Sequence, residues 1–286
     1  MKLSEMVWMG LEVLRDAKFG MLGILCHKQD QMLVMFYDEA YLDQLVANPS
    51  ISAVITTPAL AERLPNRLGI GICSDPMQVF YRIHDHLRKN TDFYGKAFVT
   101  EIDATATVSE QAFVAPRNVR IGARCVIEPK AIILEGSVLD EDVVIRAGTV
   151  IGGEGYETKM VGGQLINVRH AGGVHLAHRV EVLSQSHLAR SIFGGWTEVG
   201  EETKIDVQVH VSHHDRIGRQ CEIAAGAVIG GSTTVGDRAW IGLNAAISSG
   251  LTIGSGAFIV MGSVVAMNVP PGARVMGNPA RIMKVS

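Results

Sequence analysis

The 286-residue chain has few cysteines, almost no net charge and no long apolar run. Its four cysteines, at positions 26, 73, 125 and 221, form no CxxC pair, which argues against a disulfide framework and favours a reducing compartment. The 26 Lys and Arg against 29 Asp and Glu give a net charge of −3, which argues against a nucleic-acid partner. Neither a signal-peptide pattern nor a stretch of about eighteen uncharged apolar residues occurs, so we expect a cytoplasmic protein without membrane insertion.

Glycine is scarce before residue 100, and aromatic residues are scarce after it. Residues 1–100 hold 6 of the 31 glycines but 10 of the 16 aromatic residues. Within this first part, apolar runs predict short strands at 21–26, 32–36, 52–57 and 68–73. Residues 39–47 are expected to form a helix, and Asp75-Pro76 is typical of the start of a second one. Residues 1–100 are therefore predicted to form a small α/β domain.

A six-residue repeat dominates the rest of the chain. A branched aliphatic residue recurs at every sixth position from Ile121 to Ile151, and again without a gap from Val199 to Val265. Glycine often follows it, and a small residue usually stands four places after it. This is the hexapeptide pattern of a left-handed parallel β-helix, in which three hexapeptides form one triangular coil with the aliphatic residue inside. We expect glycine to supply turn conformations.

Two segments, 152–173 and 184–198, break the repeat. The first is polar and rich in glycine, so it is predicted to protrude as a loop, and such loops often carry specificity. We assign residues 1–100 to an α/β domain, residues 101–269 to the β-helix and residues 270–286 to a C-terminal cap.

Side chains able to do chemistry cluster within ten residues. Asp206, His210, His213, His214 and Asp215 lie there, and the repeat places His213 where its side chain leaves the prism. Neutral imidazole is a suitable general base near pH 7, and a carboxylate such as Asp206 can fix its tautomer.

Asp215 occupies one of the inward small-residue positions. A carboxylate in that position needs a partner, or else the position marks a local bulge.

Three segments, IGGEGYE, TEVGEETKIDVQVHVSHHDRIG and AAGAVIGGS, resemble the bacterial UDP-3-O-acylglucosamine N-acyltransferases. The resemblance implies a hexapeptide prism, a homotrimer with sites between subunits, and an N-terminal domain that binds the uridine nucleotide. It implies His213 as catalytic base, Asp206 as the acid that orients it, and Gly231 as donor of an oxyanion N–H. It further implies a nucleotide-linked amino sugar as acceptor and an acyl thioester as donor, with no bound cofactor or metal.

Several positions depart from the family. Gly250 stands where the family has a second histidine beside the thioester, and His214 replaces an asparagine. Tyr41 matches one of two aromatics that enclose uracil, whereas the second position falls on Met35, with Phe36 next to it. The resemblance implies a substrate-binding role for Tyr41 and, at the neighbouring or replaced positions, for Phe36 and His214.

The C-terminal sequence NVPPGARVMGNPARIMKVS resembles the ending of CoA-dependent hexapeptide sugar acetyltransferases instead of the family's helical extension. The resemblance implies donor contacts from Gly250, Arg281 and Lys284, and leaves acyl-CoA and acyl carrier protein open as donors. A simple cap closing the solenoid is the alternative.

Two other functions remain open from the sequence. One is a zinc hydro-lyase like the hexapeptide carbonic anhydrases, with His170 and His175, or His210 with His213, among the ligands. The other is a non-catalytic scaffold that uses the prism only for assembly.

Overall fold

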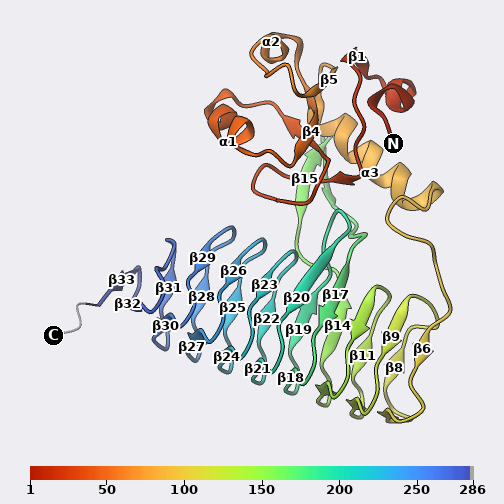
Figure 1. Ribbon diagram of the computed structural model, residues 1–286. Coiled ribbons are helices and arrows are strands. Elements are labelled where there is room, and N and C mark those ends of the chain that lie inside the picture. The colour runs from red at the N-terminus through yellow and green to blue at the C-terminus, as the bar shows by residue number, and fades with distance from the viewer. Residues whose placement is uncertain (284–286) are drawn as a thin grey trace. The chain divides into compact units, whose positions relative to one another are not determined.

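The computed structural model describes residues 1–283, which form two compact units (Figure 1). Unit 1 comprises residues 1–96 and 156–171, and unit 2 comprises residues 97–155 and the chain from 172 onward. The sequence analysis predicted a domain boundary near residue 100 and assigned all of residues 101–269 to the β-helix. The structure groups 156–171 with the N-terminal unit instead.

Unit 2 is a left-handed parallel β-helix whose three sheets form the faces of a prism. Face 1 contains β7 (Thr107–Val108), β10 (Val126–Ile127), β13 (Val144–Ile145), β18 (Glu181–Val182), β21 (Lys204–Ile205), β24 (Glu222–Ile223), β27 (Trp240–Ile241), β30 (Phe258–Ile259), β32 (Arg274–Gly277) and β33 (Ala280–Ile282). Face 2 contains β8 (Phe113–Val114), β11 (Ile132–Ile133), β14 (Val150–Gly153), β19 (His187–Ala189), β22 (His210–Val211), β25 (Val228–Ile229), β28 (Ala246–Ile247) and β31 (Val264–Val265). Face 3 contains β6 (Glu101–Ile102), β9 (Val119–Ile121), β12 (Ser137–Leu139), β17 (Gly173–Leu176), β20 (Trp196–Val199), β23 (Arg216–Ile217), β26 (Thr234–Val235) and β29 (Thr252–Ile253).

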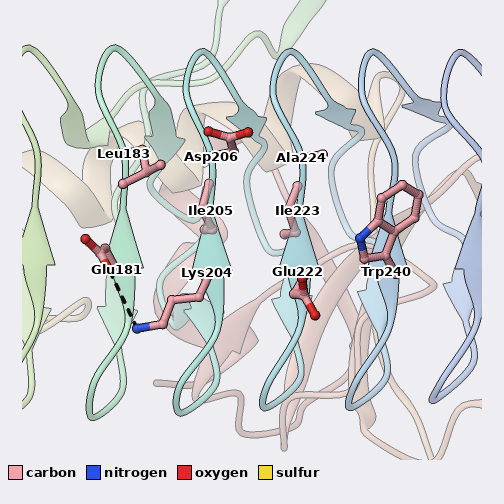
Figure 2. A pocket seen from close by; sticks show the side chains of 9 residues that line it. All are labelled: Glu181, Leu183, Lys204, Ile205, Asp206, Glu222, Ile223, Ala224 and Trp240. Carbon is pink, nitrogen blue, oxygen red and sulfur yellow. Dashed lines mark ion pairs between the residues drawn. The ribbon is translucent and has the colours of Figure 1, made fainter.

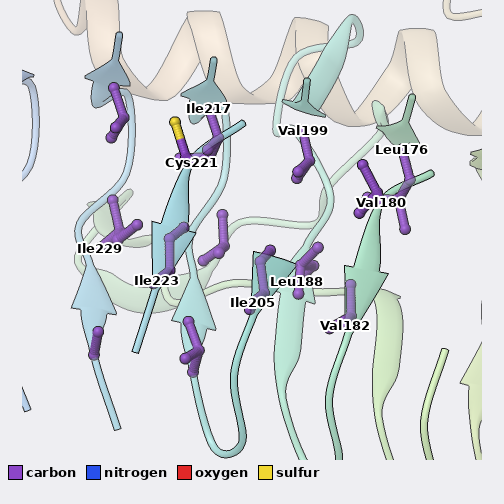
Figure 3. Close-up of a cluster of buried hydrophobic side chains, with 14 of the residues drawn as sticks. Leu176, Val180, Val182, Leu188, Val199, Ile205, Ile217, Cys221, Ile223 and Ile229 are labelled. Carbon is purple, nitrogen blue, oxygen red and sulfur yellow. The ribbon is translucent and has the colours of Figure 1, made fainter. Parts of the chain in front are cut away.

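The repeated aliphatic residues form the core of the prism, as the six-residue spacing predicted. Every one of them from Ile121 to Ile151 and from Val199 to Val265 is at most 3% exposed. The spacing also continues between the two breaks through Leu176 and Val182, and into the second break at Leu188 (Figure 3). Apolar burial of this kind is the main favourable term in folding, so the continuous column stabilises the whole solenoid.

The glycines that follow the aliphatic residues have a different role from the one expected. Most of them do not adopt positive φ; that conformation falls three residues after the aliphatic, as at Glu202 (φ 62°) and Gln208 (φ 57°). A Cβ at Gly200 would instead lie 2.6 Å from the backbone of Gly218 in the next coil. Glycine is needed there because neighbouring coils approach so closely.

The two breaks differ in structure. The segment predicted to be a protruding loop contains a hairpin of β15 (Thr158–Val161) and β16 (Gln164–Asn167). In the second break, Ile192 and Phe193 are buried between β19 and β20.

Unit 1 contains a five-stranded sheet in the order β1-β5-β4-β3-β2. The strands are β1 (Glu12–Arg15), β2 (Met21–Leu22), β3 (Met32–Phe36), β4 (Ile51–Thr56) and β5 (Gly69–Ile72), with only β1 antiparallel to its neighbour. The helical elements are η1 (Leu3–Met9), η2 (Glu39–Tyr41), α1 (Leu42–Ala47), α2 (Pro58–Ala61) and α3 (Pro76–Asn90). The sequence analysis predicted β2 to β5 and the helices at 39–47 and from Pro76, although β2 is shorter than the predicted 21–26, and it missed η1, α2 and β1.

The long helix α3 begins and packs as its sequence indicates. The Asp75 carboxylate accepts a hydrogen bond from Gln78 N at 2.9 Å, and Pro76 occupies the first turn, where no N–H is required. His84 is 2% exposed and connects the helix to the segment 156–171: its Nε2 lies 2.7 Å from the Arg169 carbonyl oxygen, and its Nδ1 2.8 Å from the Tyr94 hydroxyl. Burial lowers the pKa of His84 and so favours the neutral ring, in which Nε2 donates to the carbonyl oxygen and Nδ1 accepts from the Tyr94 hydroxyl.

Candidate active site

The structure brings His213 and Gly231 together. His213 lies in the turn between β22 and β23, at the edge where face 2 meets face 3. Its half-buried ring rests on Gly231 of the next coil, since a Cβ at that glycine would lie 2.5 Å from the His213 Cε1. The backbone joins the same two turns, with Ser232 N donating to the His213 carbonyl oxygen at 2.9 Å. Only glycine leaves room for the imidazole in this position.

The Gly231 amide has the properties of an available donor. Among residues 1–283 no acceptor receives a hydrogen bond from its N–H, whereas its carbonyl oxygen accepts one from Gly250 N at 2.9 Å. Gly250 is exposed and has a φ of +74°, with no atom within 4 Å of the position of a Cβ. The space that a side chain would fill at residue 250 is therefore open.

His214 is buried and contacts the His213 ring. It is 7% exposed, and the two rings meet edge to face with centroids 5.9 Å apart. The ring Nδ1 of His214 accepts from the backbone N–H of Ile192 at 3.4 Å, and the backbone N–H of His214 donates to Thr197 Oγ1 at 2.9 Å. The residue thus connects the second break to the turn that carries His213.

Asp206 lies at a different edge of the prism, where face 1 meets face 2. Its Oδ1 accepts from Val207 N at 2.8 Å and its Oδ2 from Ala225 N at 3.1 Å. One complete face, containing β22, separates it from His213. Such a face is about 15 Å wide at about 3.3 Å per residue. A single chain therefore does not bring the proposed acid and base together.

Asp206 borders a hollow of about 380 Å³ on face 1 (Figure 2). Lys204 and Glu181 form an ion pair at 3.8 Å there, and Trp240 forms part of the wall. The Trp240 ring stacks on Phe258 with centroids 4.3 Å apart, and the Arg274 guanidinium lies 4.5 Å from the Phe258 centroid. The sequence analysis missed these aromatics, although the 18-residue spacing of Trp240 and Phe258 indicates stacking on one face.

Face 2 carries two stacked histidines. The rings of His187 and His210 lie 5.2 Å apart and nearly parallel. Burial lowers the pKa of both rings, and for His187 the neighbouring His210 lowers it further. Both are therefore neutral near pH 7. His187 was missed in the sequence analysis because it falls inside the second break.

The histidines considered as zinc ligands belong to no metal-binding group in the part of the chain that the structure describes. His170 is buried in unit 1, whereas His175 on β17 lies 3.1 Å from the Asp140 carboxylate. Among residues 1–283 no three His, Cys, Asp or Glu side chains are grouped so that they could hold a metal ion.

Unit 1 has a hollow of about 410 Å³ at the end of β3. Tyr41 borders it and is 53% exposed. Phe36 also borders it but is only 2% exposed, whereas Tyr37, which the sequence analysis missed, is 52% exposed. Phe36 is the last residue of β3 and belongs to the core of unit 1, whereas Tyr37 and Tyr41 follow the strand and remain exposed.

The C-terminal hairpin of β32 and β33 extends face 1. Arg281 is exposed, and its Nη1 donates to the Ala280 carbonyl oxygen at 3.0 Å. Lys284, also expected to bind the donor, lies outside the described residues. No helix among residues 1–283 is long and apolar enough to span a membrane.

Comparisons with known proteins agree with this fold. Residues 118–153 match the family "Bacterial transferase hexapeptide (six repeats)", and residues 232–266 match "Hexapeptide repeat of succinyl-transferase". A UDP-3-O-acylglucosamine N-acyltransferase of Caulobacter vibrioides is 38% identical over 117 residues, which is 41% of this chain and 32% of that protein. This chain resembles that group of enzymes. A relative of the same name from Helicobacter pylori is 30% identical over 100 residues, covering 35% of this chain and 30% of its own.

The similarity is partial. The chain spans about a third of the length of the curated relatives it matches. Among solved structures, a UDP-N-acetylglucosamine acyltransferase from Campylobacter jejuni is 20% identical, with a TM-score of 0.48, over 65% of this chain and 75% of that one.

Proposed function

We propose that this chain is an N-acyltransferase that moves an acyl group from a thioester to the amine of a nucleotide-linked amino sugar. One observation carries the proposal: the His213 imidazole lies directly on Gly231, whose N–H engages no acceptor among residues 1–283. A base and an oxyanion donor in contact are the two groups that acyl transfer requires. The similarity to enzymes named UDP-3-O-acylglucosamine N-acyltransferase supports the same chemistry.

In this mechanism, the acceptor amine attacks the thioester carbonyl carbon while His213 removes the amine proton. The Gly231 N–H stabilises the tetrahedral oxyanion. The intermediate then collapses as the C–S bond breaks, and the imidazolium returns the proton to the departing thiolate. The products are an amide and a free thiol, and no cofactor is needed.

We propose that the chain forms a homotrimer in which two copies complete each site. Asp206 and His213 lie at different edges of the prism, so they can meet only if the Asp206 edge of one copy faces the His213 edge of another. The outward residues of face 2 support this arrangement because most are apolar, whereas those of face 1 include charged residues such as Lys204 and Glu222. The outward residues of face 2 are Phe113, Ile132, Val150, His187, His210, Val228, Ala246 and Val264.

For the acceptor, we propose that the hollow in unit 1 binds the nucleobase. Its exposed tyrosines, Tyr37 and Tyr41, supply flat surfaces for stacking, whereas Phe36 supports them from the core. For the donor, the open space at Gly250 gives a thioester access to Gly231. We assign the exposed Arg281 side chain to binding of the donor's phosphate groups. A cytoplasmic location would supply both acyl-CoA and acylated carrier protein.

Thiol release tests the proposal. Acetyl-CoA, longer acyl-CoAs and acylated carrier protein are each offered with a panel of UDP- and dTDP-linked amino sugars. We expect release with one class of donor, and loss of about two to four orders of magnitude in His213→Gln, the usual contribution of a positioned base. Unchanged turnover in His213→Gln would refute the mechanism, and no release with any pair would leave the scaffold function. Elemental analysis of active protein tests the alternative function as a zinc hydro-lyase. Stoichiometric zinc in the active protein would support that alternative.

A further inference from the structure

A polar column inside the prism lies beneath the two turns of the proposed site. Thr197, Asp215 and Thr233 occupy the same inward position in three successive coils, and each is 0% exposed. The strands next to Asp215 keep a regular register, with Glu198, Arg216 and Thr234 paired in line. No bulge accompanies Asp215, so the bulge considered from the sequence is wrong and the carboxyl group is part of the regular interior.

All three side chains of this column bind the turns that carry His213 and Gly231. Thr197 Oγ1 accepts from His214 N at 2.9 Å, and Thr233 Oγ1 donates to the Gly230 carbonyl oxygen at 2.6 Å. Asp215 connects the two turns directly: it belongs to the His213 turn, and its Oδ1 accepts from Thr233 N of the next coil at 2.9 Å. The Ser212 N–H lies near the same carboxyl group and lowers its pKa, although burial outweighs this effect.

The fold itself does not require an acid for this connection. In the preceding hexapeptides, Thr203 makes the equivalent coil-to-coil contact, accepting from Cys221 N at 3.0 Å and donating to the Gly218 carbonyl oxygen at 2.8 Å. A hydroxyl is therefore sufficient to join two coils. The carboxyl group is costly by comparison, because burial raises the pKa of Asp215 well above its usual range and Oδ2 has no hydrogen-bond partner among residues 1–283. Costly buried groups of this kind cluster at functional sites.

We propose that Asp215 is a positioning residue, which holds the His213 turn in register with the Gly231 turn from inside the prism. The inference rests on the proposed function for its effect on catalysis. Its carboxyl group accepts from Thr233 N in the Gly231 turn and faces the Ser212 N–H in the His213 turn. Movement of His213 by about 1 Å relative to the oxyanion donor is enough to slow the reaction substantially.

Three variants test this role in the full-length protein. Asp215→Val removes the connection, Asp215→Asn retains an acceptor for Thr233 N, and Thr203→Val removes the matched contact at another edge. We expect Asp215→Val to lower kcat about 10- to 100-fold with KM within about threefold. Asp215→Asn should stay within about threefold of the unchanged kcat, and Thr203→Val should leave kcat unaffected. If Asp215→Val is unstable, Asp215→Ala, the residue type found in the same inward position at Ala227 and Ala239, replaces it with the same expected direction.

A second measurement does not depend on turnover. Protein labelled with 13C at histidine Cε1 is titrated by NMR, and the His213 signal is identified by its absence in His213→Gln. We expect Asp215→Val to shift or broaden the His213 signal, and Thr203→Val to leave it in place. If the His213 signal shifts in Asp215→Val but the unchanged protein transfers no acyl group, the proposed function is overturned and the positioning role is retained. Normal turnover with an unmoved His213 signal in Asp215→Val would overturn the positioning role alone, as would an Asp215→Asn variant as slow as Asp215→Val.

Discussion

At the scale of single residues, the contact between His213 and Gly231 sets a strict steric requirement. A methyl group at residue 231 would lie 2.5 Å from Cε1, well inside van der Waals contact. We expect Gly231→Ala to displace the imidazole, to lower kcat at least tenfold, and to destabilise the protein by about 1–3 kcal/mol. Thermal unfolding and steady-state kinetics measure the two effects.

The double variant His213→Ala/Gly231→Ala is the control for this prediction. With the ring removed, the new methyl group has room, so the second substitution should cost little further stability. A melting temperature lowered equally by Gly231→Ala in both backgrounds would contradict the steric explanation.

Asp215 also makes a prediction about stability and pH. Since burial raises its pKa, the folded chain retains a proton that the unfolded chain releases above about pH 4. The unfolded state is thus favoured increasingly as the pH rises from about 4 toward the folded pKa. Asp215→Asn has no such proton, so it should be more stable than the unchanged protein at pH 7, and this advantage should shrink toward pH 4. Denaturant unfolding across that range measures the difference; an advantage independent of pH would show that the carboxyl group is not protonated on folding.

At the scale of elements, the end of β3 and the residues after it determine nucleotide binding. Tyr37 and Tyr41 are exposed beside the hollow, and Phe36 is in the core. We expect Tyr37→Ala and Tyr41→Ala each to weaken binding of UDP or dTDP about tenfold without loss of stability, whereas Phe36→Ala should destabilise unit 1 by about 3–5 kcal/mol. Calorimetric titration with both nucleotides decides which base is preferred, and unaltered affinity in both tyrosine variants would place the nucleotide elsewhere.

The helix α3 carries a second pH-dependent device. Burial lowers the pKa of His84, so its neutral ring and its hydrogen bonds to Arg169 and Tyr94 are fully present above about pH 6.5. As the pH falls below this value, the unfolded state takes up the proton first and the stability of unit 1 declines. We expect hydrogen exchange in peptides of α3 and of residues 156–171 to become faster between pH 6.5 and 5, after correction for intrinsic rates. Peptides of β24–β28 are the internal reference, and an equal change in both sets would contradict the assignment to His84.

The repeat made the β-helix predictable at this scale because the aliphatic, the small residue and the turn recur with one period. Each hexapeptide repeats the same local preferences, so errors do not accumulate along the chain. The hairpin 158–167 was not predictable, because its contacts are with α3, far away in sequence, and its own pattern resembles a loop. Likewise, the contact of His213 with Gly231 follows from the 18-residue coil, whereas the aromatic stack of Trp240 and the exposure of Tyr37 depend on side-chain packing that spacing alone does not specify.

At the scale of the whole molecule, the separation of Asp206 from His213 is the decisive feature. The two residues lie only seven positions apart in sequence, yet they are on opposite sides of face 2. Their proximity in sequence was the reason to pair them, but the coil directs them to different edges. If both take part in catalysis, the paired groups come from different copies, and the apolar outward residues of face 2 give a physical reason for the copies to associate.

Mixing two inactive variants tests this arrangement. His213→Ala retains Asp206, and Asp206→Ala retains His213, so each homotrimer should be inactive or nearly so. When equal amounts are unfolded and refolded together, a site is intact wherever a copy with His213 faces a copy with Asp206. Random assembly gives this pairing at about a quarter of the sites, so about a quarter of the unchanged activity should return. Co-refolded His213→Ala with His213→Gln controls for refolding, and must stay inactive. If the Asp206 and His213 variants stay inactive together while forming mixed trimers, or if Asp206→Ala is active by itself, the shared site is wrong.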